Sequence, residues 1–218
     1  EENRWALQFA EQNEWICGVV GWIDLVSPEC EKQLTEFRSH PKFVGVRHIT
    51  QGEPDDDFIL REDFNRGIRA LKKFGLVYDI LIFERHLPQT IQFVDAHPDQ
   101  VFILDHIAKP RIKDGLFEPW NKKIRELAKR PNVYCKVSGM VTEADLQTWT
   151  EAQLRPYFDA VLEAFGPRRL MFGSDWPVCL VACGYARWHK LVSDWVVKLS
   201  ADEQARVLGG TAVEAYKL

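Results

Sequence analysis

The chain has 218 residues, of which 46% are hydrophobic and 28% are charged, proportions that exclude collagen-like, coiled-coil and disordered proteins. It has 28 Lys and Arg residues against 32 Asp and Glu residues, for a net charge of -4, so it offers no basic field for nucleic acid. The longest apolar runs, such as 76–83, are too short to cross a membrane. The five Cys residues lack paired spacing, which favours a reducing compartment, and we expect a cytoplasmic protein.

The first predicted element is an amphipathic helix over 3–13, whose apolar face is marked by Trp5, Phe9 and Ile16. The pattern resembles the later part of a helix, and it follows Glu1 and Glu2 without a Met or a signal peptide. We therefore expect the natural chain to begin earlier.

Six apolar runs follow, rich in β-branched and aromatic residues and mostly continuous, which is typical of strands buried on both faces of a parallel sheet. They cover 16–25, 43–49, 76–83, 101–107, 133–137 and 170–173. The helices predicted between them cover 29–39, 61–74, 88–97, 118–130 and 154–165. From 185 to 218 the pattern predicts two or three helices and no strand. The chain is thus a βα unit repeated six times.

Two architectures accommodate this order. An open doubly wound sheet suits six strands, but its usual Gly-rich first turn is absent. A (β/α)₈ barrel needs eight strands and about 250 residues, and two more units at this spacing would add about 60 residues. Because the first helix resembles an incomplete one, we expect a TIM barrel. Residues 1–218 would form a single partial-barrel domain with six of the eight βα units.

In both architectures functional side chains lie at the carboxyl ends of the strands. Nearly every predicted strand here ends in ionisable or aromatic groups: Trp22, Asp24, Arg47, His48, Asp79, Glu84, Asp105, His106, Lys109, Lys136, Ser138, Ser174, Asp175 and Trp176. This concentration predicts a polar catalytic mouth at that end of the sheet.

Three of these residues have the clearest chemical roles. Asp175 can act as a metal ligand or as a general base on water, or it can simply cap the next helix. His106 ends a buried strand and either works with Asp175 or is structural. The Arg47 guanidinium can hold a carboxylate or an array of hydroxyls. Because side chains alternate along a strand, an inward Arg47 requires His48 to point away.

Five segments together resemble the amidohydrolase superfamily, and within it the sugar-lactonase branch typified by L-fuconolactonase and L-rhamnono-lactonase. The segments are Gly45–His48, Gln51–Asp57, Leu104–Pro110, Lys136–Gly139 and Phe172–Pro177. The resemblance implies a (β/α)₈ barrel in which Asp175 matches the carboxylate that ends strand eight. His106 then matches the His that ends strand six, and Arg47 matches a substrate-holding position on strand four.

The activity implied by this resemblance is hydrolysis of a sugar-acid (aldono) lactone such as L-fuconolactone. Asp175 would take a proton from the attacking water, and His106 would orient that water or the developing oxyanion. Substrate contacts are expected from Arg47, Lys136, Trp22 and Trp176, although core packing is the alternative for the two Trp rings. Two other functions stay open, a decarboxylase of the same superfamily and a non-catalytic truncated isoform.

The resemblance also bears on cofactors and partners. It implies one divalent metal ion, zinc or manganese, held by Asp175 and His106, or a site that works without metal. The family's His-x-His pair on the first strand does not occur in the 218 residues, so we expect it to precede Glu1. The expected partner is a small-molecule sugar lactone, with neither nucleic acid nor membrane. Open strand edges would favour a homo-oligomer.

Overall fold

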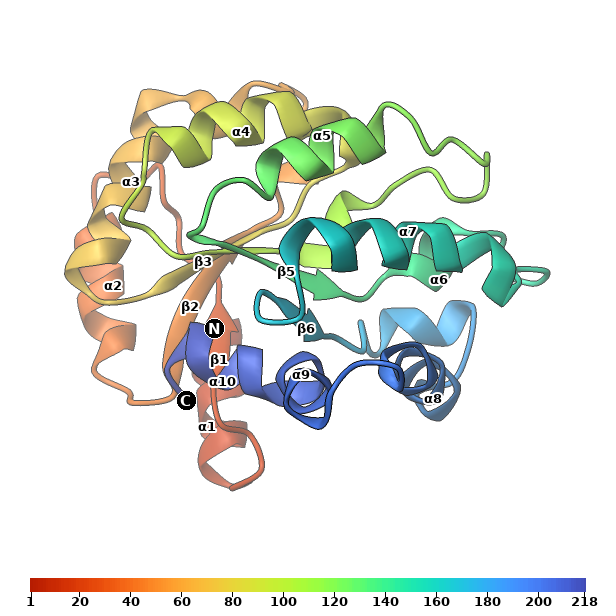
Figure 1. Ribbon diagram of the computed structural model, residues 1–218. Coiled ribbons are helices and arrows are strands. Elements are labelled where there is room, and N and C mark those ends of the chain that lie inside the picture. The colour runs from red at the N-terminus through yellow and green to blue at the C-terminus, as the bar shows by residue number, and fades with distance from the viewer.

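The computed structural model describes residues 1–218 as a curved, six-stranded sheet with helices packed along its outer face (Figure 1). The strands are β1 (Val19–Gly21), β2 (Phe43–His48), β3 (Val77–Ile80), β4 (Phe102–Leu104), β5 (Val133–Val137) and β6 (Leu170–Phe172). They pair in chain order, and every pair is parallel. The predicted α/β class and the six parallel strands of a partial barrel are therefore confirmed.

Helices connect the strands and continue after the last one. They are α1 (Glu2–Glu11), α2 (Cys30–Arg38), α3 (Glu62–Lys73), α4 (Leu87–Asp95), α5 (Trp120–Leu127), α6 (Met140–Glu143), α7 (Glu151–Phe165), α8 (Tyr185–Val196), α9 (Ala201–Ala205) and α10 (Thr211–Tyr216). No strand follows β6, as predicted for 185–218. None of the helices is long and apolar enough to cross a membrane.

The main hydrophobic core lies between the outer face of the sheet and these helices. Tyr78 of β3 is fully buried there, with its ring centroid 5.9 Å from Phe64 of α3 and 6.0 Å from Phe93 of α4. In α3 the apolar side chains recur at helical spacing, so one face is buried against the sheet while charged residues remain outside. This packing fixes the strands and therefore the side chains at their ends.

The inner face of the sheet has a smaller core of its own. Val77, Ile103 and Met171 lie on three different strands and pack with Ala215 of α10. Figure 1 shows α10 beside β1, so the end of the chain returns to the first strand. A Cβ built on Gly18 would lie 2.8 Å from the Leu218 side chain, in agreement with this return. The C-terminal helix thus covers part of the inner face.

The predicted apolar face of the first helix is wrong. Trp5 is 67% exposed and Phe9 43% exposed, whereas Asn3, Leu7 and Ala10 are buried. Asn3 can be buried because its side-chain amide donates to the carbonyl of Trp22 at 2.7 Å. Its side-chain oxygen also accepts from the Trp22 N–H at 2.9 Å. These two hydrogen bonds satisfy the polar group that the hydrophobic pattern placed on the surface.

Three predicted strands are longer than the strands in the structure. The runs 16–25, 76–83 and 101–107 contain β1, β3 and β4 but extend beyond them. Their remaining apolar residues are largely buried in the turns that follow, as Ile23, Ile82 and Ile107 show. At the carboxyl ends of these strands, where the candidate site lies, buried apolar residues therefore continue beyond the last residue of the strand.

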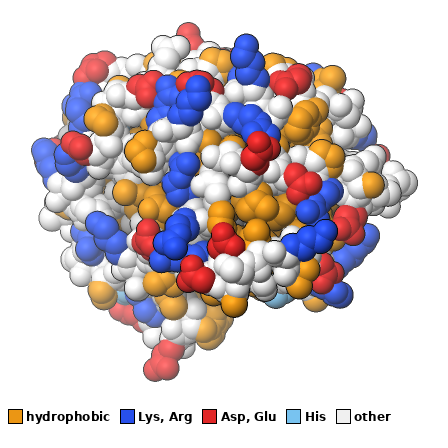
Figure 2. Space-filling view, viewed as in Figure 1, with side chains coloured by type: hydrophobic (Ala, Val, Ile, Leu, Met, Phe, Trp, Pro, Cys, Tyr) orange, Lys and Arg blue, Asp and Glu red, His pale blue; other side chains and the backbone are white.

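Charged side chains of both signs are interspersed on the face seen in Figure 2, with no broad area of one sign. This agrees with the nearly balanced composition. On that face the surface offers no extended basic stripe of the kind that holds a phosphate backbone.

Candidate active site

The structure brings the predicted site residues to the carboxyl ends of four strands. Arg47 is the last residue but one of β2, and Lys136 lies near the end of β5. Asp105 and His106 follow β4 directly, and Asp175 lies three residues after β6. In parallel sheets this end carries the functional groups, and the arrangement places five chemically active side chains there.

The backbone that carries His106 is strained. The four residues from His106 to Lys109 all have positive φ, between 49° and 62°, although none is glycine. Asp175 has a φ of 54°. Each such residue costs about 1–2 kcal/mol relative to the right-handed conformation. Strain of this kind collects where a side chain must point in a direction that regular structure does not allow.

Two buried tryptophans hold the segments that precede or contain these strained residues. The indole N–H of Trp120, in α5, donates to the carbonyl of Ile107 at 2.8 Å. The indole N–H of Trp188, in α8, donates to the carbonyl of Gly173 at 2.8 Å. Both rings are buried almost completely. The sequence gives no sign that the N–H groups of these two tryptophans hold the backbone of the site.

His106 and Asp175 face each other. The Nε2 atom of His106 lies 3.5 Å from Oδ1 of Asp175, and the Nδ1 atom lies 2.8 Å from Oγ of Ser138. A direct N–H···O bond is normally 2.7–3.2 Å long, so only the contact with Ser138 is a hydrogen bond. The Ser138 hydroxyl can donate or accept, so this contact fits either tautomer, and the tautomer protonated on Nδ1 directs its Nε2 lone pair toward Asp175.

Electrostatics favours the neutral imidazole. Burial lowers the pKa of His106 below its usual value of 6.5, although the negative charges of Asp105 and Asp175 oppose the shift. In the tautomer protonated on Nδ1, the Nε2 lone pair of His106 and the carboxyl oxygen Oδ1 of Asp175 face the same point. That point suits a cation, or a water molecule that donates hydrogen bonds to both.

Four charged side chains near the His106–Asp175 pair form a group that we call the inner charge cluster: Arg47, Asp79, Asp105 and Lys136. Lys136 Nζ lies 2.5 Å from Oδ2 of Asp79 and 2.8 Å from Oδ1 of Asp105. Arg47 Nη1 donates to Oδ2 of Asp105 at 3.1 Å. The two carboxyl groups thus have two cations as partners, which buried charges require, although burial raises the pKa of Asp79 against the opposing charge of Lys136.

The cluster holds Asp105 ionised. Burial alone would raise the pKa of Asp105, but the positive charges of Lys136 and Arg47 outweigh it and hold the pKa below its usual value. Burial would likewise lower the pKa of Lys136, yet Asp105 and Asp79 raise it well above its usual range. The Asp105–Lys136 pair, next to His106, is therefore charged at neutral pH.

The structure orients Arg47 and His48 as strand alternation predicts, but Lys136 has partners that were not expected. Arg47 points to Asp105 with its side chain 43% exposed, while His48 points away, stacked on Phe58 and 2.7 Å from Oε1 of Glu53. Lys136 is occupied by two buried carboxylates, so its ammonium has little capacity left for a ligand. The geometry gives Lys136 a role in charge balance that its position at a strand end did not suggest.

Lys109 and Glu143 flank the pair. Lys109 ends the strained turn that begins at His106, and its Nζ lies 3.9 Å from Oε1 of Glu143 and 5.6 Å from the centroid of the Phe83 ring. Burial raises the pKa of Glu143, and the charge of Asp175 adds to the shift while Lys109 opposes it. Lys109 thus pairs with Glu143 beside the His106 turn at a distance longer than a hydrogen bond, and Glu143 carries no sequence signal of its own.

Trp22 directly follows the edge strand β1, and Trp176 follows shortly after the other edge strand, β6. Trp22 is 46% exposed and Trp176 is 63% exposed. The alternative of core packing is therefore wrong for both rings. Their contact with a substrate stays a prediction.

His106 and Asp175 fit a metal ion as two of its ligands. Two ligands on one tetrahedral zinc, each about 2 Å from the metal, are separated by about 3.3 Å, close to the 3.5 Å between Nε2 and Oδ1. No group of three or more His, Cys, Asp or Glu side chains is arranged to hold a metal. The residues of this chain thus provide a partial ligand set.

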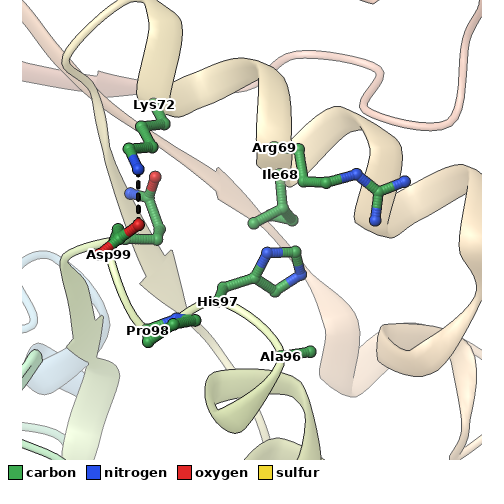
Figure 3. A pocket seen from close by; sticks show the side chains of 8 residues that line it. Ile68, Arg69, Lys72, Ala96, His97, Pro98 and Asp99 are labelled. Atoms are coloured by element: carbon green, nitrogen blue, oxygen red, sulfur yellow. Dashed lines mark hydrogen bonds and ion pairs between the residues drawn. The ribbon is translucent and has the colours of Figure 1, made fainter.

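A well-formed hollow of about 310 Å³ lies elsewhere, between α3 and the loop that leads into β4 (Figure 3). This loop precedes its strand, so the hollow is at the opposite end of the sheet from Asp175. Its His97 is held by a 2.6 Å hydrogen bond between Nε2 and Oδ1 of Asn65, and Lys72 pairs with Asp99 at 2.7 Å. These groups satisfy one another and suggest stability rather than catalysis.

Comparison with known proteins identifies the family of the chain. The family model described as Amidohydrolase matches residues 1–218. The chain belongs to the amidohydrolase family.

Among curated relatives of this amidohydrolase chain, the L-fucono-1,5-lactonase of Burkholderia multivorans is 41% identical over 229 residues, covering 100% of this chain and 77% of that protein. The L-fucono-1,5-lactonase of Burkholderia ambifaria is 36% identical, covering 100% of this chain and 76% of that protein.

A solved structure supports the architecture. The crystal structure of a zinc-bound amidohydrolase from Burkholderia multivorans superposes with a TM-score of 0.95 at 41% identity, covering 100% of this chain and 79% of that one. The predicted amidohydrolase-type barrel and the resemblance to sugar lactonases are thereby confirmed. The six strands of this chain form part of that barrel.

Proposed function

We propose that this amidohydrolase hydrolyses the cyclic ester of a sugar acid, an aldonolactone of the L-fuconolactone type. The observation that carries the proposal is the Asp175–His106 pair, with a carboxylate and a neutral imidazole directed at one point from two strained turns. The relationship to two L-fucono-1,5-lactonases supports the choice of substrate class.

In this mechanism Asp175 acts as the general base. The attacking water donates one hydrogen to Asp175 and one to Nε2 of His106, whose orientation is fixed by Ser138. As the oxygen of the water bonds to the lactone carbonyl carbon, its proton moves to Asp175. When the ring C–O bond breaks, the protonated Asp175 returns the proton to the leaving oxygen, and a hydroxy acid is released.

Two cations serve the substrate oxygens. Arg47 offers the guanidinium donors that Asp105 does not use, and Lys109 offers an ammonium that lies farther than hydrogen-bond distance from Glu143. Positive groups fixed in advance stabilise the charge that develops on the carbonyl oxygen. Lys136 acts indirectly, since it neutralises the carboxylates beneath His106 and Arg47.

A divalent metal held by His106 and Asp175 would polarise the lactone carbonyl or lower the pKa of a bound water. The zinc in the related Burkholderia multivorans structure is the reason to include this ion in assays.

The substrate class is tested by offering the chain a panel of aldonolactones beside unsubstituted δ-valerolactone, with and without added zinc or manganese. Acid release is followed at constant pH and corrected for spontaneous opening in buffer. We expect saturable hydrolysis of at least one aldonolactone and a much lower kcat/KM for δ-valerolactone. Rates equal to buffer for every aldonolactone would reject the proposal, and equal kcat/KM for both classes would reject the sugar-acid specificity.

A further inference from the structure

The last helix contributes a side chain to the inner charge cluster. The hydroxyl of Tyr216, at the end of α10, lies 2.9 Å from Oδ1 and 2.8 Å from Oδ2 of Asp79. These two residues are 137 positions apart in the chain. The Lys136 ammonium also lies 5.5 Å from the centroid of the Tyr216 ring, within range of a cation–π interaction.

From Tyr216 a continuous series of contacts leads to Arg47. Asp79 contacts Lys136 at 2.5 Å, Lys136 contacts Asp105 at 2.8 Å, and Asp105 contacts Arg47 at 3.1 Å. Both carboxylates are almost completely buried, whereas Arg47 reaches the exposed end of the sheet. The series therefore begins under α10 and ends at the guanidinium that faces the proposed substrate.

The Lys136 ammonium contacts both Asp79 and Asp105. Tyr216, which also binds Asp79, influences how close Lys136 lies to each of them. The hydroxyl satisfies part of the hydrogen-bonding demand of Asp79, so Lys136 remains close to Asp105 as well. Without the hydroxyl, Asp79 would draw Lys136 toward itself. Asp105 would then lose a cation and hold Arg47 more tightly, because a buried carboxylate needs a partner.

We propose that Tyr216 is a positioning residue for Arg47, acting through Asp79, Lys136 and Asp105. It leaves the guanidinium of Arg47 free enough to bind an oxygen-rich substrate. The effect on catalysis rests on the proposed lactonase function, whereas the effect on Arg47 itself does not. C-terminal helix α10 is thus part of the site, although it lies beneath the sheet end that carries the chemistry.

The test uses Tyr216→Phe, with Tyr134→Phe as its matched control. The Tyr134 side chain packs beside α10, and its hydroxyl lies 3.5 Å from Oε1 of Glu214, outside the series of contacts. The first readout is the rate at which phenylglyoxal modifies Arg47, followed by mass spectrometry of its peptide. We expect Tyr216→Phe to slow this modification about threefold and Tyr134→Phe to leave it unchanged. An unchanged or faster rate in Tyr216→Phe, or the same change in the control, would overturn the proposal.

The second readout is kinetic. Tyr216→Phe should raise KM for the aldonolactone about three- to tenfold, with a smaller change in kcat, since a hydrogen bond to a charged group is lost. In an Asp79→Asn background it should have no further effect, because its route to Arg47 has been removed. If Tyr216→Phe raised KM equally in the parent and in the Asp79→Asn background, Tyr216 would act only through packing, and the proposal would be rejected. If the parent hydrolyses no lactone, the proposed function fails, while the modification of Arg47 still decides the role of Tyr216.

Discussion

Asp175 and His106 follow different strands, yet their facing atoms Oδ1 and Nε2 lie 3.5 Å apart, and both residues have positive φ. Asp and His adopt positive φ more often than most residues do, but the right-handed region is still preferred. The surrounding structure imposes the positive-φ conformations, through the indole N–H groups of Trp120 and Trp188 and the hydroxyl of Ser138. This pair is the basis of the predictions below.

Gly139 tests whether the position of His106 matters. Gly139 has a φ of 66°, and a Cβ on it would lie 2.7 Å from Cβ of His106. Gly139→Ala should therefore move the imidazole and lower kcat/KM at least about tenfold, since small displacements of catalytic groups are costly. Gly115 has the same φ with open space around it, so Gly115→Ala should cost only about 1 kcal/mol of stability. Equal activity in the two variants, measured with their unfolding midpoints, would show that the placement of His106 is unimportant.

The two lysines at the site should respond differently to removal of their charge. Lys136→Met leaves two buried carboxylates without their shared cation, and the free energy of unfolding should fall by about 3–5 kcal/mol. Lys109→Met should leave stability almost unchanged and raise KM for the aldonolactone, because Lys109 is assigned to substrate. Chemical denaturation and steady-state kinetics separate the two. A strong loss of stability in Lys109→Met with unchanged KM would reverse these assignments.

Arg47→Lys keeps the positive charge but removes the planar fork of donors. One guanidinium nitrogen is bonded to Asp105 in the structure, and a lysine can hardly hold this carboxylate and a substrate oxygen together. We expect KM to rise more than kcat falls. A fall in kcat with unchanged KM would instead indicate that Arg47 acts only in the transition state.

His97, which lies far from the candidate site, should make the stability of the fold depend on pH. Burial, together with the nearby Arg69, lowers its pKa below the usual 6.5. A buried His that resists protonation stabilises the fold above the unfolded-state pKa, and this contribution is lost as the pH falls below about 6.5. The midpoint of thermal unfolding should therefore fall more steeply between pH 7 and pH 5 in the parent than in His97→Gln. Identical pH dependence in both proteins would contradict this role.

Sequence reasoning located the strands because each contains a continuous apolar run. It placed Asp175, His106 and Arg47 at the carboxyl ends of strands, where the structure has them, and their roles in catalysis stay predictions. It extended the strand at 101–107 too far, since no composition signal marks four consecutive left-handed residues. It did not reveal that Lys136 contacts two buried carboxyl groups, because these partners lie 57 and 31 residues away in the sequence. Tyr216 was missed for the same reason, as only the folded chain brings α10 to β3.

The most direct test of the proposed mechanism is the kcat of Asp175→Asn on an aldonolactone that the parent hydrolyses, corrected for spontaneous opening. Asparagine keeps the shape of the side chain but cannot accept the proton from water. Since general-base catalysis contributes about 10²–10⁴-fold, we expect kcat to fall within or beyond that range. The unfolding midpoint should change little, and Asp194→Asn, which removes an exposed carboxylate of α8, should leave kcat unchanged. An Asp175→Asn variant that hydrolyses the lactone as fast as the parent would contradict the mechanism.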